Sequence, residues 1–153
     1  MIDQAKIIQH LFEVVQQKWS GKTEGIVWPP PSFISMQGEI FDFRLEEGWL
    51  QNRFPILHEQ LNPYGTMQGG FIAAAIDNTI GPLSMLVSPP NLTRNLEVSY
   101  LKAVSPDFHH IFVRAKFLRQ QSRELFFEAS VENSRGTLLA SAKSTHWILS
   151  GHS

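Results

Sequence analysis

The chain has 153 residues, of which 42% are hydrophobic and 18% are charged, so it can form one globular domain with a substantial core. Its formal net charge of −1 gives no electrostatic reason to expect binding to nucleic acid or to an anionic membrane surface. It has no cysteine, which excludes disulfides and thiolate chemistry and fits a cytoplasmic location. We expect neither a signal peptide nor a membrane span, because no basic region precedes an apolar run and no run of 18 apolar residues occurs.

The N-terminal part predicts a helix followed by a stiff connector. Between Asp3 and about Trp19, apolar residues recur at helical spacing, and Asp3 can cap the start. The apolar set is Ile8, Leu11, Phe12, Val15 and Trp19. The following segment, 21–31, ends in three prolines that a helix cannot cross. We therefore divide the chain into a helix and linker, residues 1–31, and a main domain, residues 32–153.

From about Phe33 the pattern changes to β-structure. Glu46-Glu47-Gly48 predicts the turn of a hairpin between strands at 40–45 and 49–54. Four later strands each show alternating apolar positions and are bounded by turn residues. The alternating sets are Leu96, Val98 and Tyr100; Ile111, Val113, Ala115 and Phe117; Leu125, Phe127, Ala129 and Val131; and Leu138, Ala140, Ala142 and Ser144. This alternation predicts an antiparallel sheet with one buried face, and hence an α+β fold in which a helix covers the sheet.

The covering helix is predicted from about Gly69 to Val87, with Pro82 bending or shortening it. One side of it carries large apolar residues, namely Ile72, Ile76, Ile80, Leu83 and Val87. The other side is a stripe of small residues around one carboxylate, namely Gly70, Ala73, Ala74, Asp77 and Gly81. Two interpretations stay open: the stripe packs on a strand while Asp77 caps or pairs locally, or the stripe admits a narrow ligand or another backbone.

The ligand interpretation depends on the glycine pair that opens the helix. Free N–H groups at a helix start carry positive partial charge, and Gly69 and Gly70 let an oxygen approach them closely. A carbonyl bound there would have its developing negative charge stabilised. Asp77 lies two turns away, roughly 10 Å along the axis, which is too far to act on the same carbonyl. A second chain could supply its own Asp77 if two copies pair across their helices, so this hypothesis requires a homo-oligomer.

At this point the residues resemble a known family. The pattern Asn-x-x-Gly-x-x-His-Gly-Gly, with an acid nine residues after the histidine, resembles the hotdog-fold acyl-CoA thioesterases of the phenylacetate-pathway (PaaI-like) group. Asn62, Gly65, Gly69, Gly70 and Asp77 match this pattern, whereas Gln68 replaces the histidine. The segments 93–101 and 136–142 also resemble strands of the family. The resemblance implies a hotdog fold, an antiparallel sheet wrapped around a long helix, for about residues 33–149.

The resemblance also implies roles for individual residues. The Gly69 N–H and the Asn62 side chain would polarise the thioester carbonyl of an acyl-CoA. Asp77 of the partner chain would act as general base on water or as a nucleophile, and Thr93 would orient that water. No metal or redox cofactor is implied. We further expect substrate contacts at four positions: Gln68, Gly70, Asn78 and Arg123.

Two other functions remain open at this stage. Gln68 cannot titrate, so a hotdog module that binds acyl-CoA without catalysing a reaction is one open alternative. A hydratase on the same fold usually brings a catalytic histidine to the helix, and the helix predicted here has none. The six histidines show no helical pairing that predicts a metal site, and no Gly-x-Ser-x-Gly motif predicts a serine hydrolase.

Overall fold

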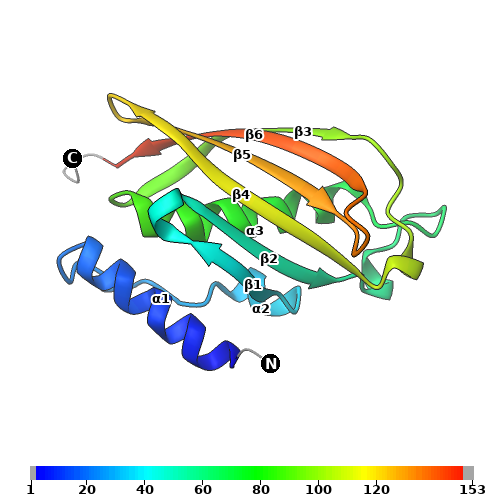
Figure 1. Ribbon diagram of the computed structural model, residues 1–153, viewed down its shortest axis with the longest axis horizontal. Coiled ribbons are helices and arrows are strands. Elements are labelled where there is room, and N and C mark those ends of the chain that lie inside the picture. The colour runs from blue at the N-terminus through cyan, green and yellow to red at the C-terminus, as the bar shows by residue number, and fades with distance from the viewer. Residues whose placement is uncertain (1–2, 150–153) are drawn as a thin grey trace.

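The computed structural model describes residues 3–149 and shows a sheet curved over one long helix (Figure 1). The helices are α1 (Gln4–Lys18), α2 (Pro31–Ser35) and α3 (Gly69–Val87), with 3₁₀ turns η1 (Leu45–Glu47), η2 (His58–Gln60) and η3 (Pro106–Phe108). The strands are β1 (Glu39–Arg44), β2 (Trp49–Pro55), β3 (Asn91–Tyr100), β4 (His110–Gln121), β5 (Glu124–Glu132) and β6 (Leu138–Ile148). The predicted α+β class is confirmed.

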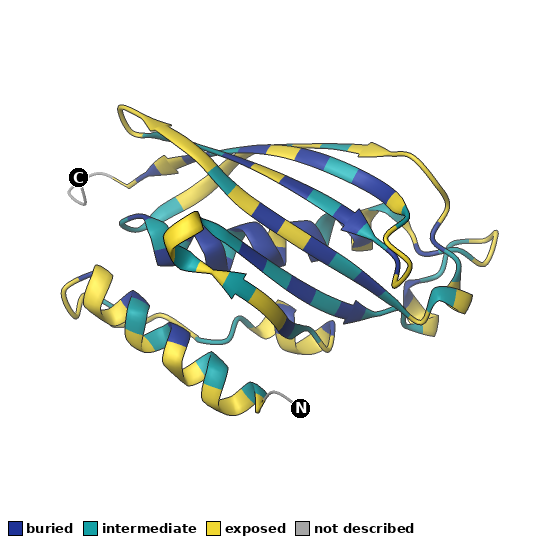
Figure 2. Ribbon diagram, in the orientation of Figure 1, coloured by how far each residue is buried: buried dark blue, intermediate teal, exposed yellow. Residues whose placement is uncertain are grey.

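Every pair of neighbouring strands is antiparallel, and the order across the sheet is β1-β2-β4-β5-β6-β3. Strands β1 and β3 are therefore its two edges. Buried and less buried residues alternate along the inner strands, as Figure 2 shows for β4, β5 and β6. This is the period of two that a sheet with one covered face requires.

The core lies between this face and α3. On the helix, Ile76, Ile80 and Leu83 are completely buried, and opposite them Ile111, Val113 and Leu125 are also completely buried. The helix continues through Pro82 to Val87, so the proline does not shorten it. Within residues 3–149, α3 is the one helix that is long and apolar enough to cross a membrane by length and composition. Its packing against the sheet identifies it as a core helix.

The N-terminal helix is part of the same packed unit. Asp3 caps α1, as predicted, by accepting a hydrogen bond from the Lys6 N–H at 3.4 Å. The Gln4 side chain both donates to and accepts from the backbone of Ile40 on β1, at 2.8 Å each. At the other end of α1, the Trp19 indole donates to the Ser88 carbonyl at 2.9 Å, just past α3. Helix α1 thus joins one edge of the sheet to the end of the core helix, and the division at residues 31 and 32 remains a prediction.

Two sequence-based expectations were wrong in detail. The change to β-structure expected from about Phe33 comes only at Glu39, one residue before the predicted strand 40–45, because Pro31 starts the short helix α2 and Phe33 packs edge-on against Phe54, with ring centroids 5.8 Å apart. Leu138 was predicted to share the core-facing side of its strand with Ala140, but it is 40% exposed. The pairing of β5 with β6 shifts by one residue next to Val131, which places Leu139 in the core instead.

Candidate active site

The start of α3 opens onto a shallow groove of about 270 Å³. Its walls come from the loop before the helix, the first turn of the helix and the segment after β3, and they include Asn62, Gly69, Ile72, Tyr100 and Lys102. Within residues 3–149, the N–H groups of Gly69 and Gly70 have no hydrogen-bond acceptor, and Gln68 provides no side-chain cap. Unpaired donors at a helix start attract a negatively charged or polarised oxygen. The start of α3 therefore offers two N–H donors to an acceptor beside the groove.

Tyr100 limits the space beside residue 69. The Tyr100 hydroxyl donates to the Gly69 carbonyl at 2.7 Å, and its ring crosses the helix start. A Cβ added at Gly69 would lie 3.1 Å from the Tyr100 ring, closer than an ordinary contact. By contrast, a Cβ at Gly70 or Gly81 would meet nothing within 4 Å. Part of the small-residue stripe is therefore open in a single protomer.

The loop before the helix is folded around the Asn62 side chain. Its Oδ1 accepts from the N–H groups of Tyr64 at 2.9 Å and Thr66 at 3.1 Å, and its Nδ2 donates to Thr66 Oγ1 at 2.9 Å. Gly65 has a φ of 79°, which the turn requires and which glycine adopts without strain. The amide of Asn62 keeps a second N–H, so Asn62 can orient the loop and still donate to a ligand in the groove.

Asp77 lies outside this groove, in a second cluster with residues of β3 and β6. It is exposed on α3, and the Thr93 hydroxyl donates to its Oδ1 at 3.1 Å. The pairing of β3 with β6 shifts between Thr93 and Asn95, and such bulges commonly redirect a side chain near a functional site. Behind Thr93, His146 Nε2 is 3.4 Å from Thr93 Oγ1. The structure thus brings Asp77 and Thr93 together, as the resemblance implies, and adds a histidine.

His146 is buried, with only 1% of its surface exposed. Burial lowers the pKa of His146 to about 4, and the nearby Asp77 carboxylate acts in the opposite direction to a smaller degree. The imidazole is therefore neutral near pH 7. No local motif in the sequence assigns His146 to the site. The alternation through Ala140, Ala142 and Ser144 continues to position 146 and could have predicted an inward-facing histidine.

No protein-family model matches the sequence, and a search of curated proteins finds no match. Solved structures do match over most of the chain. A Ralstonia eutropha JMP134 protein related to phenylacetic acid degradation, assigned as a thioesterase, is 24% identical, with a TM-score of 0.72 over 86% of this chain and 99% of that one. The Escherichia coli PaaI protein of the phenylacetic acid degradation operon is 12% identical, with a TM-score of 0.74 over 93% and 98%.

The chain has the hotdog fold. A Streptococcus pneumoniae TIGR4 hypothetical thioesterase, solved with coenzyme A, also matches, at 20% identity and a TM-score of 0.71 over 80% of this chain and 94% of that one. The resemblance to PaaI-like thioesterases inferred from the sequence is thereby confirmed for the fold.

The four positions expected to contact substrate are not together in this hotdog protomer. Gln68 and Gly70 are exposed at the start of α3, where a ligand in the groove could reach them. Asn78 is buried and turned away, because its Oδ1 accepts from Ser32 at 2.9 Å and its amide faces Met36. Arg123 donates to the Ile148 carbonyl at 2.7 Å at the β4–β5 turn, away from the groove. The positions of Asn78 and Arg123 therefore do not support a substrate contact within one protomer.

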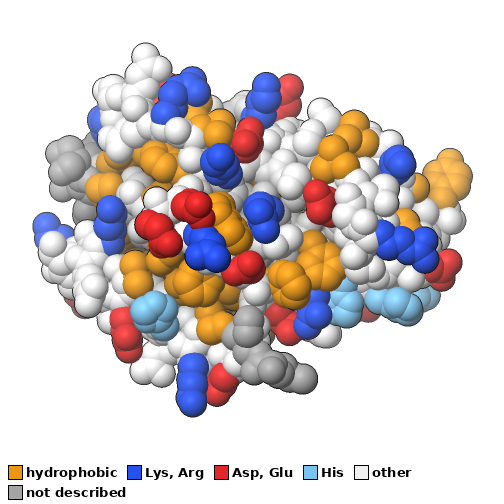
Figure 3. All heavy atoms as spheres, viewed as in Figure 1, with side chains coloured by type: hydrophobic (Ala, Val, Ile, Leu, Met, Phe, Trp, Pro, Cys, Tyr) orange, Lys and Arg blue, Asp and Glu red, His pale blue; other side chains and the backbone are white. Residues whose placement is uncertain are grey.

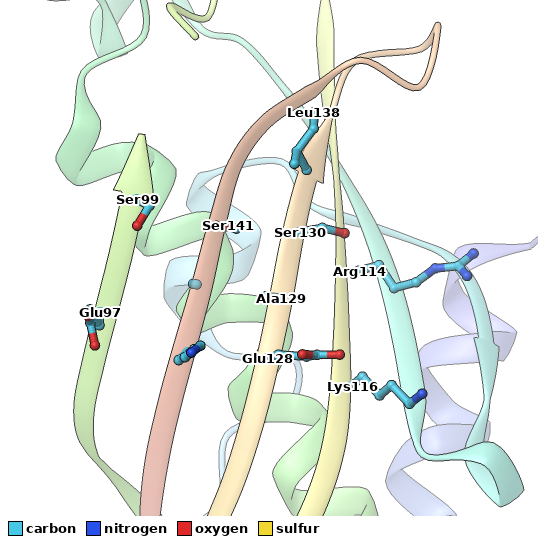
Figure 4. Close-up of a pocket in the computed structure, with 11 residues that line it drawn as sticks. Glu97, Ser99, Arg114, Lys116, Glu128, Ala129, Ser130, Leu138 and Ser141 are labelled. Carbon is cyan, nitrogen blue, oxygen red and sulfur yellow. The ribbon is translucent and has the colours of Figure 1, made fainter. Parts of the chain in front are cut away.

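The outer face of the sheet carries a larger hollow of about 450 Å³ (Figure 4). Acidic and basic side chains alternate across it from strand to strand, in the order Glu97, Lys143, Glu128 and Lys116. Figure 3 shows acidic and basic side chains intermingled over the face in view, with no large area of one sign. Alternating charges on neighbouring strands stabilise a sheet. This face holds neither the helix start nor Asp77, so we do not assign the active site to it.

Proposed function

We propose that the protein is an acyl-CoA thioesterase that hydrolyses a thioester to a free acid and coenzyme A. The observation that carries the proposal is the pair of unpaired N–H groups at Gly69 and Gly70, at a helix start where Gly69 and Asn62 both line the groove. The fold shared with proteins assigned as thioesterases, one of them solved with coenzyme A, supports the same substrate class.

In the proposed reaction the thioester carbonyl oxygen lies against the Gly69 N–H and the Asn62 amide. These donors stabilise the negative charge that develops when water attacks, and the loss of one such donor typically costs about 3–4 kcal/mol of transition-state stabilisation. Asp77 takes the proton from the attacking water, a step in which a positioned base contributes roughly 10²–10⁴ in rate. Thr93 holds the carboxylate through its hydroxyl. Water adds to the carbonyl, the C–S bond breaks, and the proton passes from Asp77 to the leaving thiolate.

The reaction requires two chains, because the groove and Asp77 belong to separate clusters within one protomer. We propose that a second copy pairs along β3. This edge strand is ten residues long, and within residues 3–149 it pairs with no strand other than β6. Leu92, Tyr100 and Leu101 on or just after it are more than half exposed, although they are large and apolar. A long edge with exposed apolar side chains favours pairing with another strand. The open stripe at Gly70 and Gly81 would let the second copy approach α3.

The same arrangement suggests where coenzyme A would enter. Lys102 lines the groove beside Tyr100 and is exposed, so it can meet a phosphate of the cofactor portion of the substrate. We propose that the enzyme acts in the cytoplasm, where acyl-CoA thioesters are found and where a chain without cysteine needs no oxidising environment.

The alternative is a module that binds acyl-CoA without hydrolysing it, and Gln68 favours this alternative because it replaces the family histidine at the helix start. Thiol release from a panel of acyl-CoA substrates separates the two functions. We expect release by the wild-type chain and its loss in Asp77→Asn, which removes the base from an exposed position without disturbing the core. Binding of acyl-CoA with no release by the wild-type chain would favour the module.

A further inference from the structure

His146 is a buried polar residue that the proposed reaction does not use. It lies on β6 with its ring packed against Phe127, at a centroid distance of 4.9 Å. Both ring nitrogens have polar neighbours: Nδ1 is 2.8 Å from Asn91 Oδ1, and Nε2 is 3.4 Å from Thr93 Oγ1. The hydrogen bonds therefore form a continuous chain from Asn91 through His146 and Thr93 to Asp77, and the four residues come from three elements of the fold, β3, β6 and α3.

The orientation of Asn91 decides which nitrogen of His146 carries the proton. The Asn91 amide nitrogen donates to the Pro89 carbonyl at 3.0 Å and approaches the Ser84 carbonyl at 3.4 Å. Its Oδ1, an acceptor only, therefore faces the histidine, so His146 Nδ1 must be the donor. Because burial keeps the pKa of His146 near 4, the ring is neutral and Nε2 presents a lone pair to Thr93.

The Thr93 hydroxyl consequently has one hydrogen and two acceptors, Asp77 Oδ1 at 3.1 Å and His146 Nε2 at 3.4 Å. An ionised carboxylate is the stronger acceptor, so the hydrogen points to Asp77 before the reaction. Once Asp77 has taken a proton, it is a neutral acid and a much weaker acceptor. The imidazole lone pair is then the better partner for the same hydrogen.

We propose that His146 is a positioning residue whose Nε2 receives the Thr93 hydroxyl hydrogen while Asp77 is protonated, so that Thr93 keeps a hydrogen bond throughout the reaction. The inference rests on the proposed thioesterase function. In the step itself, an O–H bond of water breaks, its proton goes to an Asp77 oxygen, and the hydroxide oxygen bonds to the carbonyl carbon. The Thr93 O–H bond stays intact and only rotates. When Asp77 returns its proton to the leaving thiolate, the hydroxyl turns back to the carboxylate.

The hydrogen-bond arrangement can be tested without any activity. ¹⁵N NMR of the histidine-labelled wild-type chain at pH 7 reports which ring nitrogen is protonated. We expect a neutral His146 with the proton on Nδ1. A proton on Nε2, or a charged ring, would overturn the proposal because Nε2 could not then accept from Thr93.

The catalytic role is tested by a double-mutant cycle in thiol release. His146→Phe keeps the packing against Phe127 but removes the acceptor, and we expect kcat to fall about fivefold to tenfold with little change in KM, as for the loss of one hydrogen bond. In a Thr93→Val background, which lacks the hydroxyl, His146→Phe should cause no further loss. His146→Gln, whose amide oxygen can accept, should recover part of the rate. An equal loss in both backgrounds would show a merely structural role and overturn the proposal.

A matched control removes a buried side chain with hydrogen bonds far from Thr93. Asn133→Ala loses the contacts to the Arg135 and Thr137 N–H groups in the β5–β6 turn and should lower stability without changing kcat. If the wild-type chain releases no thiol while NMR shows the proton on His146 Nδ1, the proposed thioesterase function is wrong, and so is the proposed role of His146 in catalysis. The hydrogen-bond arrangement of Asn91, His146 and Thr93 would then still stand, so the two failures are distinguishable.

Discussion

Replacing Gly69 with proline should remove the oxyanion donor while leaving the helix in place. Gly69 is the first residue of α3, where proline is well tolerated because its missing N–H has no helical partner. Gln68 has φ −65° and ψ 139°, the extended conformation that a residue before proline prefers. Gly69→Pro therefore deletes one N–H and fills its place with a methylene group, directly where the thioester oxygen would bind.

Gly69→Ala is the matched control because it keeps the N–H but adds the same Cβ. That Cβ would approach the Tyr100 ring to 3.1 Å in both variants, and Tyr100 is 51% exposed and can move slightly. Relative to Gly69→Ala, we expect kcat of Gly69→Pro to fall roughly 10²–10³-fold, the usual effect of losing an oxyanion donor. The assay is thiol release at saturating acyl-CoA, with circular dichroism to confirm folding. Activity of the proline variant within about threefold of the alanine variant would refute the role of the Gly69 N–H.

Three further predictions concern stability and binding. Burial holds the pKa of His146 near 4, against 6.5 in an unfolded chain, so between these pH values the unfolded state binds a proton that the folded state lacks. The free energy of unfolding, measured with urea, should therefore fall by about 2 kcal/mol between pH 7 and pH 5 because of this residue. This part of the fall should be absent in His146→Phe. Leu11→Ala removes a fully buried side chain from α1 and should cost about 2–5 kcal/mol of unfolding free energy, and a smaller loss would mean that α1 packs only loosely on the domain. Asn78→Ala breaks the bond to Ser32 and should lower the free energy of unfolding by about 1–3 kcal/mol while KM for acyl-CoA stays the same, whereas a raised KM would restore Asn78 as a substrate contact.

The elements that sequence analysis predicted well are those with a strong local signal. The glycine pair that opens α3 and the segment Ser88-Pro89-Pro90 that follows it predict its bounds, and the structure has them at Gly69 and Val87 as predicted. The β1–β2 hairpin follows from Gly48, which has a φ of 73°. Helix α2 was missed because five residues are too few to show a helical period.

The candidate site was predictable only in part, because its residues meet through strand pairing. Asp77 and Gly69 lie within one motif, and Thr93 was added by resemblance to a known family. The contact between Thr93 and His146 depends on the register of β3 on β6, including the shift after Thr93, which no local pattern specifies. Asn91 has no local pattern that predicts a role, yet its side chain orients His146. The groups with a chemical signature can therefore be predicted from the sequence, but those that orient them cannot.

The central claim is that each active site combines the α3 start of one chain with Asp77 of another. The most direct test is a purified mixed dimer of Gly69→Pro and Asp77→Asn chains, made by co-expression with two different tags. If Asp77 acts across the interface, one site of the mixed dimer holds both changes and the other is intact, so thiol release should recover to about half that of the wild-type dimer. If Asp77 acts within its own chain, every site carries one change, and the mixed dimer would be as inactive as its parents.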